Sequence, residues 1–570
     1  MKSAWLPALI LAAISGGLYS PFFSPLDLPY RESIEPGYAG MARFIREHPN
    51  PWGWYPIQYR GLPTQFMYLP ALPYAAAALS TVTGVEPEYA HRLITAVFAL
   101  LAPVALYAFL AYFLRARWWA FAIGLAYLLV SPSYGLIEQI DKDRGLVYLP
   151  WRLQVMAKYG EGPHNVGLAL LLPTLIAIWR AATQRTHTSL VIAAIAMAAV
   201  VLVNWICGLA LALAVLVLML SVFGLGRELQ FSFRRVFLAG ALAYGLACFW
   251  LIPTLIRTTF FNWPKDAFGY KVDDRSWWWF AGWIGGLVLI RLLFIGRNQW
   301  LLCFVTMGFY CFGFLSIGYY SFQHDTLPES RRYTLEFELF LFLAVSMWLR
   351  LGLQSPNGVH KFCAIAPLVV MLAQGTPQIL RVATQSRAEW KLEAKESTVE
   401  YQIAKWLNEQ KPQGRIFASG GLRFRLNSWF LLPQAGGTFE TGLHTREPLA
   451  HAYKVRTNLG SRPGEELKDA LAALEQLGVE YLVVHGSGSS EYYRDFKNPQ
   501  LYAALPVAAR FGEDVIYRIP FTPPLRENPR PEIPDQKPLG VISAAVWIGS
   551  IGLCLSERRR RRPASSVSNP

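Results

Sequence analysis

The sequence predicts an α-helical polytopic membrane protein that carries a C-terminal extracytoplasmic α/β domain. Of its 570 residues, 53% are hydrophobic, and the mean hydropathy of +0.27 is too high for an ordinary soluble protein. Apolar segments of membrane-spanning length alternate with loops whose Lys and Arg fall almost entirely on one side. We therefore expect a membrane domain followed by a soluble one.

About twelve segments have the length of roughly 17 to 25 apolar residues that a membrane helix needs. They lie at 4–20, 90–113, 117–134, 164–182, 187–204, 206–224, 235–255, 277–295, 299–317, 334–352, 361–377 and 539–555. The apolar stretch 66–79 is short and contains two prolines, and a crossing there would place the later basic loops outside. We predict that it forms a juxtamembrane or re-entrant helix packed against protein.

Basic residues set the predicted orientation, because cytoplasmic loops of membrane proteins are enriched in Lys and Arg. The rule places the N-terminus inside, with the connections at 115–117, 180–185, 227–235, 297 and 350–361 and the tail 558–562. The acidic loops then lie on the outer face of a multi-pass protein of the plasma (inner) membrane. Because this anchoring accounts for the formal charge of +15, we expect no nucleic-acid partner.

Hydropathy divides the chain into three regions. Residues 1–377 form the membrane domain with a long first outer loop at 21–89, residues 378–538 form the soluble α/β domain, and residues 539–570 form a terminal membrane anchor with a basic cytoplasmic tail. Residue patterns in the soluble domain predict helices at 397–410 and 465–477, and strands starting at 415, 479 and 515.

The first outer loop contains the catalytic candidates Glu32 and Glu35. About 45 residues without a span separate the first membrane helix from the re-entrant helix, a length that needs an explanation. The two glutamates share a face on any helical turn, and a carboxylate there can accept a proton from a sugar hydroxyl. Trp52 and Tyr55 are candidate substrate-binding residues, because aromatic rings stack on sugars. The alternative is a solvated helix that starts at Glu35-Pro36.

Acidic residues recur in the second outer loop. Asp141 and Asp143 can share a divalent cation such as Mg²⁺ or Mn²⁺ through oxygen ligands, with substrate phosphates completing the shell. Glu161 and His164 are further candidates for substrate binding. The alternatives are an ordinary charged loop and, for His164, a cap at the start of a helix.

A late outer loop carries two cations against the general charge trend. Arg331 and Arg332 lie where Lys and Arg are otherwise few, which favours contact with an anion such as a lipid phosphate. Glu329 precedes them and is a candidate for substrate binding. A structural ion pair between Arg332 and Glu336, four residues apart, is the alternative. Glu336 and Glu338 enter an apolar run, where ionisable groups are costly and point to a function.

The order of these parts resembles the GT-C class of polytopic glycosyltransferases, especially bacterial members with a C-terminal extracytoplasmic domain. The likeness covers most of the chain, and its most specific pieces are Gly61-Leu-Pro-Thr-Gln-Phe-Met-Tyr-Leu-Pro70 and Gly478-Val-Glu-Tyr-Leu-Val-Val484. It implies inverting sugar transfer from a polyprenyl-phosphate donor, with a base or metal ligand in the first outer loop. That residue is commonly Asp in the class, whereas Glu32 and Glu35 are the best placed here.

The resemblance also implies an acidic pair in the second outer loop, which Asp141 and Asp143 match. A Trp-Trp-Asp acceptor motif is absent from the soluble domain, so we do not expect Asn glycosylation. The expected activity is transfer of a sugar to an envelope glycan, lipid or protein on the extracytoplasmic face. Two alternatives remain, namely a transporter or flippase for lipid-linked glycans and a non-catalytic envelope assembly protein.

The predicted orientation can be tested by labelling introduced cysteines from outside the cell. A membrane-impermeant thiol reagent should label Ser487→Cys in the soluble domain and miss Ser566→Cys in the tail, because the two positions lie on opposite sides of the membrane. The reverse pattern would contradict the whole orientation.

Overall fold

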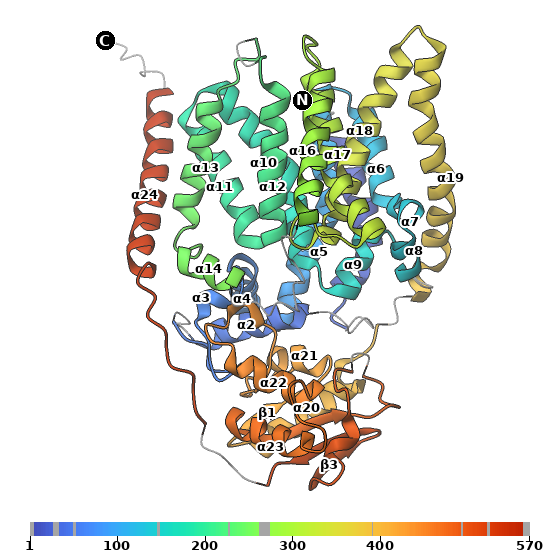
Figure 1. Cartoon of the computed structure of the whole chain (residues 1–570). Coiled ribbons are helices and arrows are strands. Elements are labelled where there is room, and N and C mark those ends of the chain that lie inside the picture. Colours follow the sequence, from blue (N-terminus) through green and yellow to red (C-terminus); the bar gives the residue numbers. More distant parts are fainter. Residues whose placement is uncertain are drawn as a thin grey trace, which may run out of the picture.

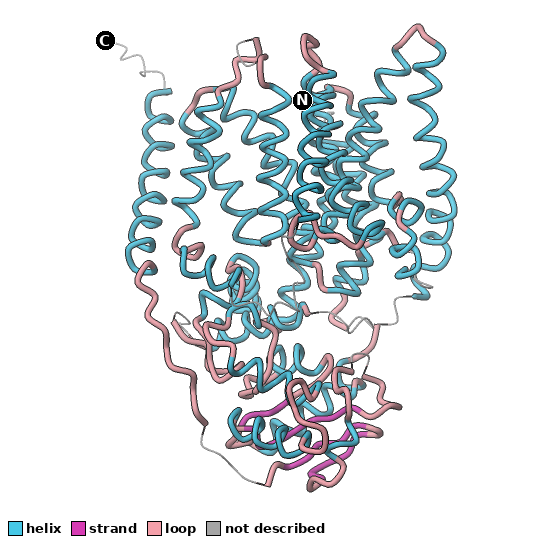
Figure 2. Tube along the Cα trace, in the orientation of Figure 1, coloured by secondary structure: helices cyan, strands magenta, loops and turns pink. Residues whose placement is uncertain are grey.

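The computed structural model describes residues 5–26, 34–48, 53–144, 149–225, 228–261, 274–389, 392–491, 494–520 and 525–561. Most of these residues form helices that stand side by side as a bundle, and a smaller domain with a sheet lies at one end of it (Figure 1). The named strands all belong to that smaller domain (Figure 2).

Each predicted span overlaps a helix of the bundle. These helices are α1 (Trp5–Leu18), α5 (Pro87–Leu114), α6 (Arg117–Leu129), α10 (Gly162–Gln184), α11 (His187–Val203), α12 (Trp205–Val222), α13 (Phe233–Ala247), α16 (Asp274–Leu293), α17 (Trp300–Phe322), α18 (Thr334–Gln354), α19 (Gly358–Glu389) and α24 (Gln536–Arg561). The spans predicted at 235–255 and 117–134 run past the ends of α13 and α6. Among the described residues, seven helices are long and apolar enough to cross a membrane. The chain is therefore a multi-pass membrane protein, and the count of about twelve spans stays a prediction.

The outermost helices of the bundle expose large apolar side chains. Trp278 on α16, Phe362 on α19 and Ile548 on α24 are 80%, 72% and 71% exposed. In a soluble protein so many exposed apolar groups would favour aggregation, whereas in a bilayer they face lipid.

The start of α1 and the end of α24 lie toward one end of the bundle, and the smaller domain lies at the other (Figure 1). This arrangement agrees with the predicted relation of the soluble domain to the two termini. Which end faces the cytoplasm stays a prediction.

Short helices fill the layer between the bundle and the smaller domain. They are α2 (Glu35–Glu47), α3 (Thr64–Met67), α4 (Ala71–Thr83) and α14 (Pro253–Phe261). The apolar stretch predicted to be re-entrant forms α3 and α4, with a break at Pro70, and α4 packs on α2 and α5. Helix α4 ends at Gly84, whose φ of 77° is readily adopted only by glycine.

Three more short helices connect α6 to α10 at the same end of the bundle. They are α7 (Ser133–Leu136), α8 (Glu138–Arg144) and α9 (Trp151–Tyr159). Glu338, which the sequence marks as a costly charge in an apolar run, binds the start of α7 by accepting from Ser131 Oγ (3.2 Å), Ser133 N (3.3 Å) and Ser133 Oγ. Its burial therefore has a structural explanation.

The smaller domain, here called the outer domain, has a four-stranded sheet in the order β1-β2-β4-β3. The strands are β1 (Arg415–Phe417), β2 (Val479–His485), β3 (Val507–Phe511) and β4 (Asp514–Arg518). Strand β1 pairs parallel with β2, and the other pairs are antiparallel. The helices are α20 (Val399–Gln410), α21 (Leu422–Trp429), α22 (Glu447–Thr457) and α23 (Glu466–Leu477).

Both helices and all three strands predicted for the outer domain are present, whereas α21, α22 and β3 were not predicted. Helix α19 also continues to Glu389, past the predicted domain boundary at 377, and α24 begins at Gln536 rather than 539. Hydropathy detects only the apolar part of a helix, and the polar residues after 377 are good helix formers.

Residues 53–62 of the first outer loop, here called the docking loop, are hydrogen-bonded to the outer domain. Gln58 is fully buried, donates to Asn427 Oδ1 (3.1 Å) and accepts from Thr438 N (3.0 Å). Tyr59 Oη donates to the carbonyl of Gly437 (2.9 Å). Next to the loop, Arg43 of α2 donates to the carbonyl of Ser428 in α21 (2.7 Å).

Asn528 holds a strained turn in the docking loop. Tyr59 and Arg60 have φ values of 51° and 65°, which are unfavourable for residues other than glycine. The Asn528 side chain donates to the carbonyls of Tyr59 (2.7 Å) and Gly61 (2.8 Å), and its backbone N donates to that of Arg60 (2.7 Å). One residue near the C-terminus thus satisfies three carbonyls of this turn.

Gln58→Ala should weaken the docking of the outer domain. The substitution leaves the partly buried Thr438 N without its acceptor, which costs about 1–3 kcal/mol, so the unfolding temperature should fall. The matched control is Gln500→Ala, because the Gln500 side chain is exposed. Equal unfolding temperatures for the two variants would contradict the role of Gln58.

Candidate functional site

A cavity of about 710 Å³ lies between the membrane bundle and the outer domain. Its wall is formed by α8, α9, the start of α10, the end of α17 and residues 331–335, and it is completed by Ile34 and by Phe424 of α21. Five residues singled out in the sequence line it: Asp143, Glu161, His164, Arg331 and Arg332. Two loops that the sequence predicts on the outer face, separated by more than 150 positions, therefore converge in this cavity.

Arg332 links the two loops. Its Nη1 lies 3.2 Å from Glu161 Oε1, and its Nε lies 2.9 Å from Glu329 Oε2. Arg331 Nε also approaches Glu329 Oε2 (3.3 Å), and its side chain is 54% exposed. The alternative pair between Arg332 and Glu336 is not formed, because Glu336 binds His164 instead. Arg331 therefore has more guanidinium N–H groups available for a ligand than Arg332 has.

Glu161 is an ionised carboxylate at neutral pH. Burial would raise the pKa of Glu161, but the positive charge of Arg332, with His164 and Arg331, outweighs burial and lowers the pKa to about 2. A carboxylate with so low a pKa is a weak proton acceptor at neutral pH. Glu161 is therefore suited to holding cations and to orienting Arg332 and His164, and poorly suited to general-base catalysis.

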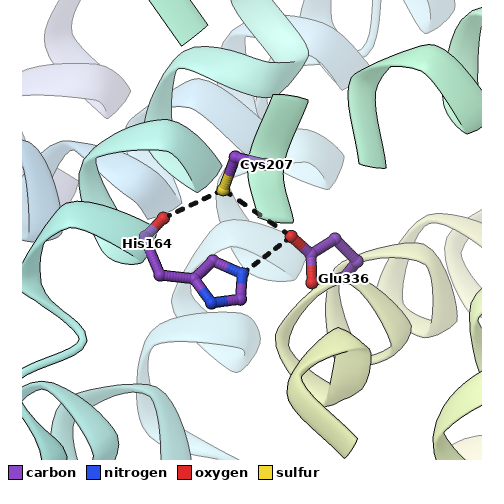
Figure 3. A group of neighbouring side chains, drawn as sticks. All are labelled: His164, Cys207 and Glu336. Atoms are coloured by element: carbon purple, nitrogen blue, oxygen red, sulfur yellow. Dashed lines mark hydrogen bonds and ion pairs between the residues drawn. The ribbon is translucent and has the colours of Figure 1, made fainter. Parts of the chain in front are cut away.

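A buried polar cluster lies behind the cavity wall (Figure 3). His164 of α10 places Nε2 at 2.9 Å from Glu336 Oε1 of α18. Cys207 of α12 donates its thiol to the His164 carbonyl (3.2 Å), and its Sγ lies 3.8 Å from Glu336 Oε1. Sequence reasoning singled out His164 and Glu336 separately and missed Cys207. A usable signal was the preceding Asn204, which caps α12 through the N–H of Cys207 (2.9 Å) and so marks the outer end of that helix.

Asp141 and Asp143 lie on α8, where positions two apart point to different sides. Asp143 Oδ1 accepts from Tyr159 Oη (2.6 Å) and lies 3.0 Å from Lys158 Nζ. Asp141 is exposed and does not line the cavity. The helix therefore does not bring the two carboxylates together on one face.

Glu35 begins α2, where the alternative interpretation of this segment places the helix start, but the first turn is buried rather than solvated. Glu35 faces α5 and the start of α10. Its Oε1 lies 2.9 Å from His91 Nδ1 and accepts from Thr95 Oγ1 (3.2 Å). A Cβ at Gly162 would lie only 2.8 Å from the same oxygen, so the glycine leaves room for Glu35 beside Glu161. Ile34 lines the cavity, whereas Glu35 does not.

The remaining sequence candidates lie away from the cavity or outside the described residues. Glu32 and Trp52 lie outside the described residues. Tyr55 is fully buried and packs its ring edge-on against Phe44 (4.7 Å), so it is a core residue of the docking loop that packs on α2. Glu329 contacts both arginines without lining the cavity.

Comparison with solved structures identifies the fold. The chain is similar to ArnT from Cupriavidus metallidurans, solved with undecaprenyl phosphate bound, at a TM-score of 0.51 and 13% identity over 91% of this chain and 98% of that one. It is also similar to the mycobacterial arabinofuranosyltransferase AftD, at a TM-score of 0.50 and 15% identity over 90% of this chain and 40% of that one. The chain has the GT-C fold, which confirms the resemblance noted in the sequence.

Sequence comparison adds less. A family model described as a 6-pyruvoyl-tetrahydropterin synthase related domain of a membrane protein matches residues 145–280, which run from just before α9 into α16. No curated protein sequence matches the chain. At 13% and 15% identity, the structural likeness concerns the fold.

The Glu161–Arg332 pair should give a defined pH dependence of stability. Because the pKa of Glu161 is lowered from 4.5 to about 2 in the folded protein, its contribution is present above about pH 4.5 and lost as the pH falls toward 2. Arg332→Gln should therefore destabilise the protein at pH 6 by roughly 1–3 kcal/mol, and this deficit should shrink on acidification. Unfolding temperatures measured across this pH range test the expectation.

The matched control is Arg350→Gln at the other end of α18, since Arg350 donates to the Leu114 carbonyl (3.1 Å). The loss of stability caused by Arg350→Gln should not change with pH. A deficit of Arg332→Gln that is equally independent of pH would show that the pair does not determine the state of Glu161.

Proposed function

We propose that the protein is a glycosyltransferase that moves a sugar from a polyprenyl-phosphate donor to an acceptor hydroxyl. The observation that carries the proposal is the cavity between the bundle and the outer domain, where Arg331 and Arg332 meet Asp143 and Glu161. The GT-C fold supports it, because ArnT and AftD share that fold and ArnT was solved with undecaprenyl phosphate. The acceptor class is an envelope glycan, lipid or protein, and the working face is extracytoplasmic.

Arg331 and Arg332 are proposed to bind the donor phosphate. Guanidinium groups form paired, charge-assisted hydrogen bonds with phosphate oxygens. Arg332 is already oriented by Glu161 and Glu329, and the more exposed Arg331 has further N–H groups for the ligand. During transfer the sugar–phosphate bond breaks, and the same contacts stabilise the negative charge that develops on the leaving phosphate.

A carboxylate of the first outer loop is proposed as the general base. As the acceptor oxygen bonds to the anomeric carbon, its proton passes to the carboxylate, and the polyprenyl phosphate leaves from the opposite face. Glu161 is a poor candidate for this role because its pKa is about 2. Glu35, beside Gly162 at the start of α10, and Glu32 are the proposed residues, and an expected contribution of about 100- to 10,000-fold is typical of general bases.

Variants of purified protein in proteoliposomes test the base and the donor site separately. Glu35→Gln should lower transfer from an undecaprenyl-phosphate-linked sugar by about 100- to 10,000-fold while leaving the affinity for undecaprenyl phosphate nearly unchanged. Glu47→Gln, at the other end of α2 with a 41% exposed side chain, is the matched control. Arg331→Ala should instead weaken undecaprenyl phosphate binding by roughly 1.5–3 kcal/mol.

The outcomes distinguish errors of detail from errors of function. Full turnover in Glu35→Gln, with loss of turnover in Glu32→Gln or Asp27→Asn, would reassign the base within the same reaction. Wild-type protein that neither binds undecaprenyl phosphate nor transfers a sugar from any donor of this class would contradict the transferase itself.

A further inference from the structure

Three helices of the bundle begin beside the cavity and each contributes its third residue to one buried cluster. His164 is the third residue of α10, Cys207 the third of α12 and Glu336 the third of α18. Their side chains point toward one another (Figure 3), and the residues are 1%, 0% and 0% exposed. The cluster therefore joins one imidazole, one thiol and one carboxylate at a junction of three helix N-termini.

We propose that His164, Cys207 and Glu336 bind a single transition-metal ion of the Zn²⁺ class. Nitrogen, sulfur and oxygen ligands of this kind suit Zn²⁺, which lies about 2.0–2.3 Å from each ligand atom, so that neighbouring ligand atoms are about 3.3–3.8 Å apart. One ligand atom from each residue lies within 4.8 Å of the others. The His164–Glu336 pair, now 2.9 Å apart, has only to open by a few tenths of an ångström.

The carboxylate of Glu336 has an unused oxygen. Within the part of the chain that the structure describes, Glu336 Oε2 is buried without a hydrogen-bond partner. An unsatisfied carboxylate oxygen in a buried site is costly, and a bound cation would remove that cost.

Glu161 supplies the outer partner that metal-binding histidines usually have. Its Oε2 lies 3.6 Å from His164 Nδ1, on the side of the ring opposite Glu336. A carboxylate in this position orients the imidazole so that the other ring nitrogen faces the metal, and its loss typically weakens metal binding about 10- to 100-fold. His164 also forms part of the cavity wall, which gives an entry route.

A glycine on α10 leaves room for Cys207 in the cluster. A Cβ at Gly167 would lie 2.5 Å from Cys207 Cβ and 2.6 Å from its Sγ, so α12 can approach α10 this closely only because residue 167 is glycine. The site differs in residues and in ligand chemistry from the Asp141–Asp143 pair. Metal binding at these side chains does not depend on the proposed transferase activity.

Cobalt binding tests the site without any activity assay. Full-length protein carrying Cys363→Ser, which removes an exposed cysteine, is treated with a chelator in detergent and titrated with Co²⁺. We expect one ion per chain and a thiolate-to-cobalt charge-transfer band in the near ultraviolet. Cys207→Ser should abolish the band, whereas Cys303→Ser, which changes another buried cysteine, should keep it.

A further variant separates the metal site from a folding defect. Glu161→Gln keeps all three ligands, so it should keep the band and weaken Co²⁺ affinity about 10- to 100-fold. Absence of the band in the Cys363→Ser protein, or its survival in folded Cys207→Ser, would overturn the proposal and leave a hydrogen-bonded triad without metal. Failure of sugar transfer with a normal band would contradict only the proposed function.

Discussion

Buried hydrogen bonds between the docking loop and the outer domain position the two surfaces that enclose the cavity. Gln58 and Asn427 are both fully buried and bond to each other across this interface. Trp429 of α21 adds a bond to Glu88 at the start of α5 (2.9 Å). Since Phe424 of α21 and Ile34 before α2 both line the cavity, its shape depends on how these elements are held together.

Charge compensation is the second constraint on the site. Arg332 and Arg331 are balanced by Glu329, and Arg332 also by Glu161. Glu161 in turn approaches His164, which binds Glu336. A change at one member therefore alters the electrostatic environment of the next, and the cavity surface is coupled to the interior of the bundle through side chains alone. Substitution of Arg332 therefore disturbs Glu161 and His164 as well as the cavity surface, whereas substitution of Arg331, which among the described residues pairs only with Glu329, affects the surface more directly.

Much of the fold was predictable from the sequence, because lipid contact requires long apolar helices whose positions can be read directly. Strand β2 is buried along its whole length and was predicted from its apolar run. Helix α21 was not, since it buries Arg423 and Arg425, and Arg423 lies 3.5 Å from Glu440. Such pairing hides the apolar periodicity on which sequence prediction depends. Strand β3, at the edge of the sheet and partly exposed on both faces, offers no clear alternation.

The site was predictable only in parts. Charge against the general trend singled out Arg331 and Arg332, and an acidic loop singled out Glu161 and Asp143. Their meeting in one cavity depends on tertiary packing, which the sequence does not display. Cys207 could not be predicted for a related reason. A thiol in an apolar segment resembles an ordinary core residue, and only the tertiary structure brings a carboxylate and an imidazole beside it.

The docking loop also constrains the order in which the protein can be completed during synthesis. Gln58 is separated by 369 positions from Asn427, its hydrogen-bond partner. The carbonyl of Gly61 is separated by 467 positions from its donor, Asn528. At a synthesis rate of about 5–20 residues per second, Asn528 is added to the chain roughly half a minute to a minute and a half after the docking loop. Throughout that interval the helices of the bundle can be inserted while the cavity still lacks its cover. A nascent chain of this protein is therefore assembled in the membrane well before its cavity is closed.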